Sequence, residues 1–114
     1  MSRKRSIGTN LTDTTKTTAY TVPTGISAYW QLLYIVNTGS TNSISVWWYD
    51  ASTNTEYYVV GGKNLGTGEY LLFNGAEVVL QHGDQIRYQL SSAGSMTVIS
   101  TVEINSPIGI NGGS

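Results

Sequence analysis

The chain has one histidine, His82, in the segment Gln81-His82-Gly83-Asp84. A histidine with a carboxylate two positions away could act as a general base that the carboxylate orients. No recognisable nucleophile motif accompanies the pair, and a glycine beside the histidine marks a turn that needs unusual backbone angles. We therefore interpret His82 as a turn residue and expect no catalytic residues and no enzymatic activity.

Two further patterns bear on metal and cofactor binding. One histidine, no cysteine and acids scattered over separate turns give no cluster of metal ligands. Gly61-Gly-Lys-Asn64 matches a phosphate loop only in part, because Asn64 stands where that loop needs Ser or Thr and no helical pattern follows. We interpret this segment as a hairpin or inter-sheet loop, and we expect neither a metal nor a cofactor.

The aromatic residues of the middle of the chain offer a different chemistry. Alternation along an extended strand splits each neighbouring aromatic pair across two faces, and we expect that Trp47, Tyr49, Tyr57 and Tyr58 could form an outward platform. Three roles stay open for these side chains: core beneath a second layer, a protein interface, or stacking on sugars. Polar residues suited to sugar binding stand nearby, at Asp50, Asn54 and Glu56. Trp47, Tyr49 and Tyr57 are therefore candidate partner-binding residues.

The two ends of the chain are further candidates. Arg3, Lys4 and Arg5 are half of the six cations, and the rest of the chain has a net charge of −4. Such a basic arm suits nucleic acid, an acidic face of a partner protein, or simply solvent. Nucleic acid is disfavoured as the main ligand because three charges release few counterions. At the other end, Ile108 and Ile110 are isolated apolar residues that suggest a docking element.

Composition limits the class of protein. The 114 residues suffice for one domain. Charged residues make up 11% of the chain, against about 25% in a typical soluble domain. Few charges and many hydroxyl groups suggest a surface that is partly covered in an assembly. The basic start is not followed by an apolar stretch, and no apolar run approaches the ~18 residues of a membrane helix, so we expect no signal peptide and no membrane association.

The elements that position these residues are short strands. β-branched and aromatic runs alternate with Gly, Pro, Asn and Ser turns, and no window has a sustained helical period. The expected strands are Thr12–Val22, Ala28–Asn37, Ser43–Tyr49, Thr55–Val60, Glu69–Asn74, Glu77–Gln81, Asp84–Ser91 and Ser95–Ile104. This spacing predicts an all-β, eight-stranded antiparallel β-sandwich of the jelly-roll type. It would comprise residues 12–104, between an extended basic arm (1–11) and an extended C-terminal tail (105–114).

Ala28–Asn37 is the strongest of these strands. Leu33, Ile35 and Asn37 share one face, and the other face holds Trp30, Leu32, Tyr34 and Val36. Because both faces are apolar, we expect a central strand that is covered on both sides.

Several segments also carry a family resemblance. They are Tyr20-Thr-Val-Pro-Thr-Gly25, Leu32-Leu-Tyr-Ile-Val-Asn-Thr-Gly39, Val46-Trp-Trp-Tyr-Asp50, Gly68-Glu-Tyr-Leu-Leu-Phe73 and Val78-Val-Leu-Gln-His-Gly-Asp-Gln-Ile-Arg87. In the spacing of its strands and in its turn residues, the chain from Tyr20 to Ile104 resembles small all-β virion proteins of tailed bacteriophages, particularly short-tailed marine and cyanobacterial ones.

This resemblance implies a role rather than a site. Members of the group are virion structural proteins, variously capsid decoration (cement) proteins or parts of the tail and the head-to-tail connection. It implies a protein made in the host cytoplasm and built into the virion in many copies, with the major capsid protein or other virion subunits as partners. The rival hypothesis is a carbohydrate-binding module for host attachment, built on the aromatic residues.

Overall fold

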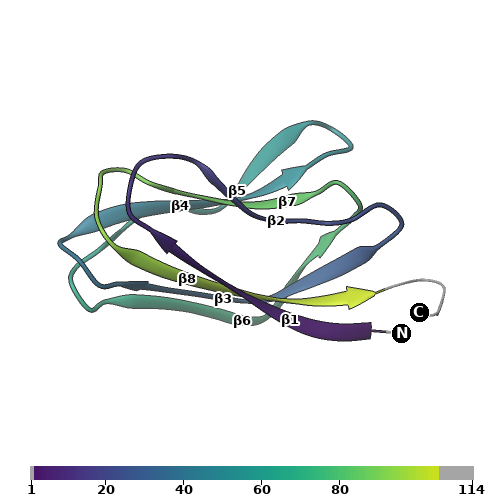
Figure 1. The fold of residues 1–114 in the computed structure, drawn as a ribbon, viewed down its shortest axis with the longest axis horizontal. Coiled ribbons are helices and arrows are strands. Elements are labelled where there is room, and N and C mark those ends of the chain that lie inside the picture. Colours follow the sequence, from purple (N-terminus) through teal and green to yellow (C-terminus); the bar gives the residue numbers. More distant parts are fainter. Residues whose placement is uncertain (1, 106–114) are drawn as a thin grey trace.

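The chain folds into two packed β-sheets (Figure 1). The structure, a computed structural model, describes residues 2–105, with the backbone alone at residues 2 and 75–77. The strands are β1 (Ser2–Leu11), β2 (Thr17–Thr21), β3 (Ser27–Asn37), β4 (Asn42–Asp50), β5 (Thr55–Leu65), β6 (Tyr70–Leu80), β7 (Gln85–Leu90) and β8 (Met96–Asn105). No helix occurs within the described residues.

Strand pairing follows one simple rule. Sheet A has the order β1-β8-β3-β6, and sheet B has the order β2-β7-β4-β5. All described pairs are antiparallel, and β1 pairs with β8, β2 with β7, β3 with β6 and β4 with β5. A long hairpin folded over on itself produces this order, which is that of a jelly roll. The structure thus confirms the expected eight-stranded antiparallel sandwich.

The core lies between the two sheets. Strands β7 and β8 alternate strictly between buried and partly exposed residues, as expected for strands with one face on a core. Ile35 and Val98 of sheet A and Ile44 and Ile86 of sheet B are completely buried. Tyr88 of β7 crosses this layer, and its hydroxyl forms a short hydrogen bond with the hydroxyl of Ser100 on β8. A polar contact therefore joins the two sheets inside an apolar core.

The N-terminal segment is not an arm outside the sandwich. Ser2–Leu11 forms β1, which pairs with β8 in continuous register from Ser2 opposite Asn105 to Leu11 opposite Met96. The expectation of an arm over residues 1–11 was wrong. The strand could not be predicted from the sequence because the segment lacks an apolar alternation. Its place in the sheet comes from backbone pairing and from burial of Leu11, which is 4% exposed.

Irregularities in the strand register explain two other differences between the expected and the observed strands. Strand β3 lies between β8 and β6, as expected for a central strand, but its register shifts between Trp30 and Leu32 on both sides. The shift turns Trp30 inward to the face of Leu33, not to the face of Tyr34 as expected. Asn74-Gly75 does not end a strand, because β6 continues through this irregularity to Leu80.

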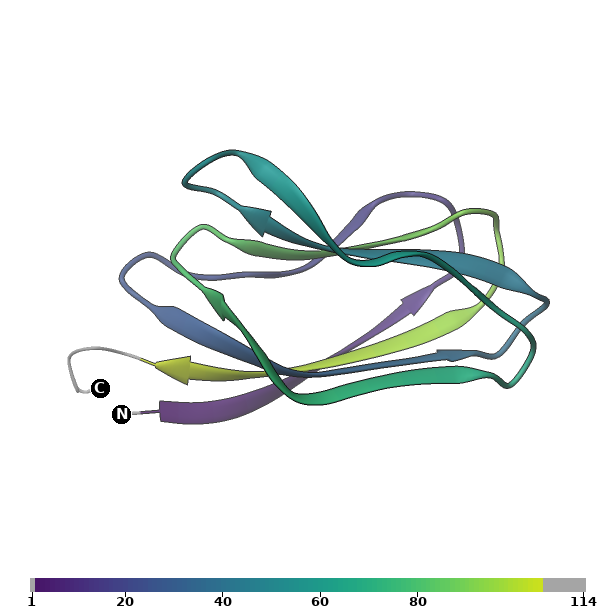
Figure 2. The same ribbon diagram turned by 180° about the vertical axis from the view of Figure 1, so that it is seen from behind.

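Two of the four edge strands lie on the same side of the sandwich. β6 borders sheet A, and β5 borders sheet B. Although consecutive in the chain, they are not paired with each other. The view from behind in Figure 2 brings β6 to the front, with the connection from β5 descending to it.

Candidate partner-binding faces

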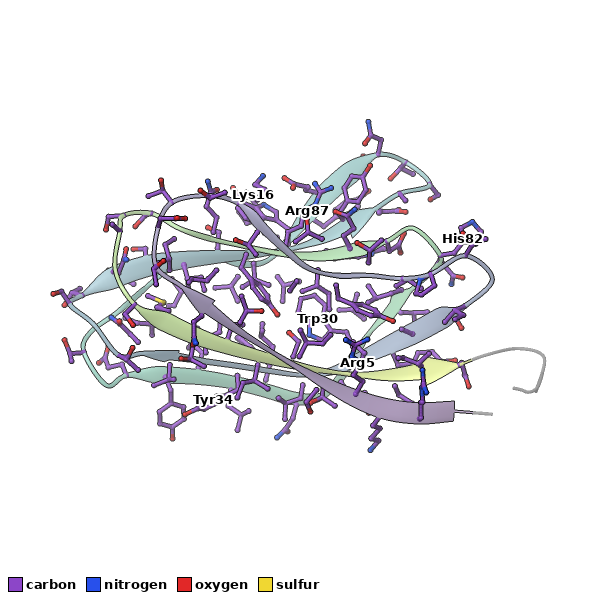
Figure 3. The ribbon with its side chains drawn as sticks, viewed as in Figure 1. Arg5, Lys16, Trp30, Tyr34, His82 and Arg87 are labelled. Carbon is purple, nitrogen blue, oxygen red and sulfur yellow. The ribbon has the colours of Figure 1, made fainter. Side chains whose placement is uncertain are left out.

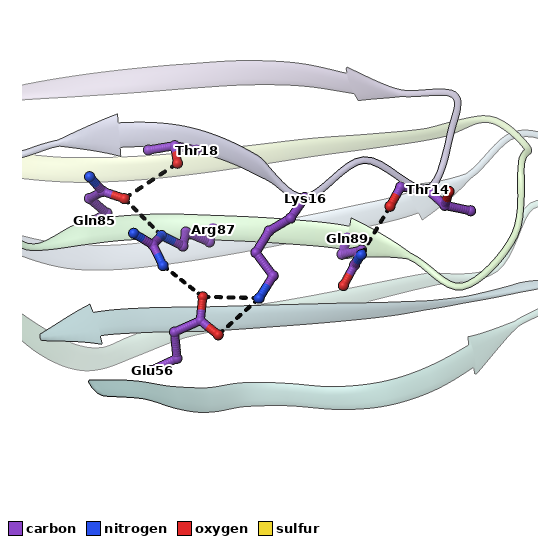
Figure 4. Close-up of polar contacts among 7 residues, drawn as sticks. All are labelled: Thr14, Lys16, Thr18, Glu56, Gln85, Arg87 and Gln89. Carbon is purple, nitrogen blue, oxygen red and sulfur yellow. Dashed lines mark hydrogen bonds and ion pairs between the residues drawn. The ribbon is translucent and has the colours of Figure 1, made fainter. Parts of the chain in front are cut away.

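The outer face of sheet B carries a charge network centred on Glu56. Its Oε1 atom lies 2.9 Å from Lys16 Nζ, and its Oε2 atom lies 2.8 Å from Arg87 Nη1. Lys16 precedes β2, Glu56 belongs to β5 and Arg87 to β7, so one carboxylate joins three parts of the sheet (Figure 4). Gln85 extends the network by accepting hydrogen bonds from Arg87 Nε and Thr18 Oγ1. We call this outer surface the polar face; its residues are Lys16, Thr18, Trp47, Tyr49, Glu56, Tyr58, Gln85, Arg87 and Gln89.

The same two cations cover the aromatic residues of this face. Lys16 Nζ lies 4.2 Å from the ring centroid of Trp47, and Arg87 Cζ lies 3.8 Å from that of Tyr49. The Tyr58 ring packs beside Trp47 with its centroid 5.4 Å away. Trp47 is only 6% exposed in consequence. These contacts leave Trp47 no open ring face for a sugar or a partner, because cation–π and aromatic neighbours already occupy it.

Electrostatics at Glu56 agree with this geometry. Partial burial, the largest single influence, would raise the pKa of Glu56. Hydrogen bonds and charges from Arg87 and Lys16 together outweigh burial and lower the pKa of this carboxyl below its usual value. Glu56 is therefore ionised at neutral pH, and the charges of the polar face are satisfied within the chain.

Of the three aromatic candidates, Tyr57 lies apart from the other two. Trp47 and Tyr49 point outward on the polar face, as expected from alternation. Tyr57 is opposite Trp48 in the register and stacks on its ring at 5.2 Å, on the inner side of the sheet. Trp48 packs against the core. Tyr57 therefore shares no surface with Trp47, although it is 46% exposed at the edge strand β5.

The outer face of sheet A is apolar, in contrast to the polar face. On the β8 side Tyr29 and Val36 lie opposite Glu103 and Thr97, but the other outward neighbours in the register are apolar: Tyr29 with Val79, Tyr34 with Leu72 and Ile99, and Val36 with Tyr70. We call these seven residues the apolar face. Tyr34 points away from the sandwich in Figure 3, and its ring lies 5.9 Å from that of Tyr70. Tyr70, Leu72 and Val79 are 61%, 48% and 45% exposed.

Among the side chains that the structure describes, the charges on the outer side of sheet A lie on β1 and β8. Lys4 is opposite Glu103 in the register, and Glu103 accepts a hydrogen bond of 2.8 Å from Gln31 Nε2. Soluble monomers rarely expose contiguous apolar patches of more than a few hundred Å² without a role in binding. The apolar face, with Lys4 and Glu103 at its border, is thus the surface of the described chain best suited to a protein partner.

The three cations of β1 point to different sides. Arg3 and Arg5 stand opposite Ile104 and Val102, whose side chains face inward, and Figure 3 places Arg5 between the two layers. Both lie near Tyr20 of β2. Burial raises the pKa of Tyr20, and the charges of Arg5 and Arg3 partly offset that rise. Lys4, which alternates with them, faces outward beside the apolar face. Ile108 and Ile110 lie outside the described residues.

His82 and Asp84 do not act on each other. One Asp84 carboxylate oxygen accepts hydrogen bonds from the Gln81 backbone N–H (2.9 Å) and from Trp48 Nε1 (3.1 Å), and the other accepts one from the Ala51 N–H (3.0 Å). Asp84 is 1% exposed, whereas His82 is exposed (Figure 3). The carboxylate therefore fastens the β6–β7 turn to the end of β4. Gly83 in this turn has a φ of +85°, which agrees with the interpretation of His82 as a turn residue.

The segment that partly matches a phosphate loop is a distorted part of β5. We expected Gly61-Gly-Lys-Asn64 to be a hairpin or inter-sheet loop. The structure instead places this segment within the strand. Gly62 has a φ of +68°, and its N–H donates to Ser45 Oγ of the neighbouring strand. This N–H thus has a partner in the sheet, which leaves it unavailable to a phosphate.

Other kinds of site were sought in the described part of the chain. The side chains described by the structure include no group of three or more His, Asp or Glu that could hold a metal ion. Within residues 2–105, no helix is long and apolar enough to cross a membrane.

Sequence reasoning missed the residues that define both faces. Lys16, Glu56 and Arg87 stand far apart in the chain, and only the sheet order brings them together. Tyr70, Leu72 and Val79 were read as ordinary strand residues. One feature of the sequence did indicate the apolar face, because Ala28–Asn37 is apolar on both sides. In the structure, the described chain covers only the inner side of this strand.

Comparison with known proteins gives matches in fold only. No protein-family model matches the sequence, and a search of curated proteins finds no match. Among solved structures, a chain in the acid-stable capsid of Helicobacter pylori bacteriophage KHP30 matches with a TM-score of 0.60 and 13% identity, over 93% of this chain and 94% of that chain.

Two other structures match comparably well. The VP2 protein of infectious bursal disease virus, in T=1 particles, matches with a TM-score of 0.58 and 14% identity over 93% of this chain. This chain covers only 33% of the VP2 chain. A chain of the disulfide-linked pili that form Bacillus endospore appendages matches with a TM-score of 0.56 and 15% identity, over 92% of this chain and 88% of that chain. At these identities the matches establish the shared sandwich fold.

Proposed function

We propose that the protein is a non-enzymatic structural component of a bacteriophage virion, and most specifically a decoration (cement) protein that stabilises the assembled capsid. The observation that carries the proposal is the match to a chain of a bacteriophage capsid over more than nine-tenths of both chains. Jelly rolls are frequent in viral capsid proteins, lectins and cupins, and the match to a capsid chain supports the first of these classes. Localisation to the virion and partnership with major capsid subunits belong to this proposal.

The two outer faces suggest how such a protein would sit on a shell. Burial of apolar surface contributes about 25 cal/mol per Å². Burial of paired charges brings a desolvation penalty that often equals or exceeds their attraction. The apolar face is therefore the face that gains from contact, and the polar face gains most by remaining in water. In this arrangement Tyr34 and Leu72 contact the shell, while Lys16, Glu56 and Arg87 face the solvent.

The basic residues of β1 extend the proposed contact. Lys4 borders the apolar face on its β1 side, whereas Arg3 and Arg5 point to the inner side of β1 and would meet a partner only at this edge of the sandwich. Acidic groups of a capsid subunit are the complement of these charges. A protein that binds only the assembled shell stabilises it by linkage, because its binding free energy is lost when the shell comes apart.

Co-sedimentation with capsids provides the test. Purified protein is added to shells of the encoding phage that lack it, and the bound fraction is measured against concentration. We expect saturable binding by the natural chain and a rise in the temperature at which the shell disassembles. Leu72→Ser on the apolar face should weaken binding about tenfold, which corresponds to about 1.4 kcal/mol. Gln89→Ser, a truncation on the polar face, is the matched control and should bind as the natural chain does.

Two other outcomes identify the alternatives. Binding to tails or to the head-to-tail connection, and not to the shell, would assign the protein to that part of the virion. Binding to defined sugars on a glycan array, without binding to shells, would make it a carbohydrate-binding module. Tyr58, which is 67% exposed on the polar face, is the aromatic ring that such a module would use. Either result contradicts the cement function.

A further inference from the structure

The four edge strands of the sandwich differ in how they are protected from further pairing. An edge strand presents unpaired N–H and C=O groups to which another strand can bind, and charges, shortness or bulges normally prevent this. β1 carries Arg3, Lys4 and Arg5, and β2 has five residues and a register shift. β5 includes Lys63 and two register shifts against β4. Tyr70–Asn74 of β6 has no charged residue and pairs regularly with β3 on one side only.

A cavity opens beside this unprotected edge. It has a volume of about 140 Å³, and its walls include Trp30 and Leu33 of β3, Val59 of β5, and Phe73 and Val78 of β6. Phe73 alternates with Leu72 and points toward the gap between the sheets, where the unpaired strands β5 and β6 leave the core accessible from the side. An apolar cavity of about this size accepts a group as large as benzene, so one branched aliphatic side chain matches its volume.

An exposed strand edge with a pocket beside it can bind an extended peptide by strand addition. In this mode of recognition the backbone of an extended peptide pairs with the edge, and alternate side chains enter pockets. Within this chain, residues 106–114 have the matching sequence, Ser-Pro-Ile-Gly-Ile-Asn-Gly-Gly-Ser, without a charge. Ile108 and Ile110 are two positions apart, so both lie on the same side of an extended strand.

The distance that the C-terminal segment would have to span shows whether it could bind the β6 edge of its own molecule or only that of a neighbouring copy. Strand β8 ends at Asn105, opposite Ser27 and close to Leu80, the last residue of β6. A strand added outside β6 lies three strand spacings from β8, about 14 Å, which uses about four residues at 3.3 Å each. Ile108 would still be crossing the end of the sheet, and Phe73 lies about 20 Å further along β6. A second copy has no such limit.

We propose that residues 107–110 of a second copy add to the Tyr70–Asn74 edge of β6 as an extended strand, with an isoleucine in the cavity between β5 and β6. Each copy then donates one segment and receives another, so the contact closes as a reciprocal dimer or continues head-to-tail into rings or open chains. The inference does not rest on the virion function, because it concerns contact between copies of this chain alone.

Sedimentation velocity of the full chain over a wide concentration range tests the proposal. We expect the mean sedimentation coefficient to rise with concentration. Two changes should move this rise to at least tenfold higher concentration: the double variant Ile108→Ser/Ile110→Ser in the donated segment, and Phe73→Ser in the cavity. Leu72→Ser is the matched control, since Leu72 and Phe73 are adjacent and 48% and 46% exposed but face opposite sides of β6. It should associate as the natural chain does.

A peptide of residues 105–114 offers a second measurement. In excess it should dissociate the assemblies of the natural chain, and the same peptide with both isoleucines changed to serine should not. The proposal is overturned if the natural chain stays monomeric at every concentration, or if association is insensitive to the isoleucine changes. It is also overturned if Leu72→Ser abolishes association and Phe73→Ser does not, because the apolar faces would then form the contact. Loss of shell binding without loss of self-association would refute the cement function only.

Discussion

Tyr88 shows how a single buried polar group shapes the stability of this sandwich. Burial raises the pKa of Tyr88 to about 12, and the hydrogen bond to Ser100 opposes that rise only in part. In the unfolded chain a tyrosine ionises near pH 10. The unfolded state therefore loses its proton first as the pH rises, and stability present below pH 10 is lost between about pH 10 and 12.

The expected loss from Tyr88 is about 2–3 kcal/mol across this range, since each pKa unit corresponds to about 1.4 kcal/mol. Urea unfolding of the natural chain and of Tyr88→Phe at several pH values from 8 to 12 measures it. Tyr88→Phe should be less stable near neutral pH, because Ser100 loses its partner, and the two curves should converge as the pH rises. Parallel curves over the whole range would mean that Tyr88 ionises as freely in the folded chain as in the unfolded one.

At the scale of the strand, β1 is the element whose role changed most between sequence and structure. Deleting residues 2–10 removes most of an edge strand, exposes the length of β8 and uncovers core residues such as Val98 and Val102. We expect the midpoint of thermal unfolding to fall by at least several degrees, because 1 kcal/mol corresponds to about 4–8 °C for a domain near this size. A detached arm would instead leave the midpoint unchanged. Lys4→Ser, on the exposed outer side of β1, serves as the control and should shift the midpoint little.

Alternation predicted some strand features well and missed others for identifiable reasons. The opposite faces of Trp47 and Trp48 follow from strand parity alone. The predicted total of eight strands was correct only because two errors compensated each other. β1 was not predicted as a strand, and β6 was predicted as two strands separated at Asn74-Gly75. Neither the register shift at Trp30 nor the continuation of β6 can be read from residue type, because both depend on the neighbouring strands.

For the candidate site, single residues were predictable and surfaces were not. The outward positions of Trp47 and Tyr49 followed from alternation, but the cations that cover them come from other strands. Tyr57 was assigned to the same surface although the register pairs it with Trp48 on the inner side. The low charge of the chain and the two apolar sides of Ala28–Asn37 indicated a covered surface, and the structure locates an uncovered apolar face on sheet A.

On the scale of the whole molecule, the sandwich has two unlike outer faces. Lys16, Glu56 and Arg87 close the polar face by interactions within the chain, whereas the described part of the chain provides no comparable cover for Tyr34, Tyr70 and Leu72. This asymmetry gives the molecule an orientation at any interface it joins. It also separates the two proposed contacts, since the shell would meet the outer side of sheet A and a neighbouring copy would meet the edge of β6.

A reconstruction of the virion at a resolution that separates β-strands is the most direct test of the central claim. We predict that the jelly roll lies on the outside of the capsid, with Tyr34 and Leu72 against major capsid subunits and Glu56 toward the solvent. Density for the chain in the tail, its absence from the particle, or a jelly roll that contacts the shell through its polar face would contradict the account.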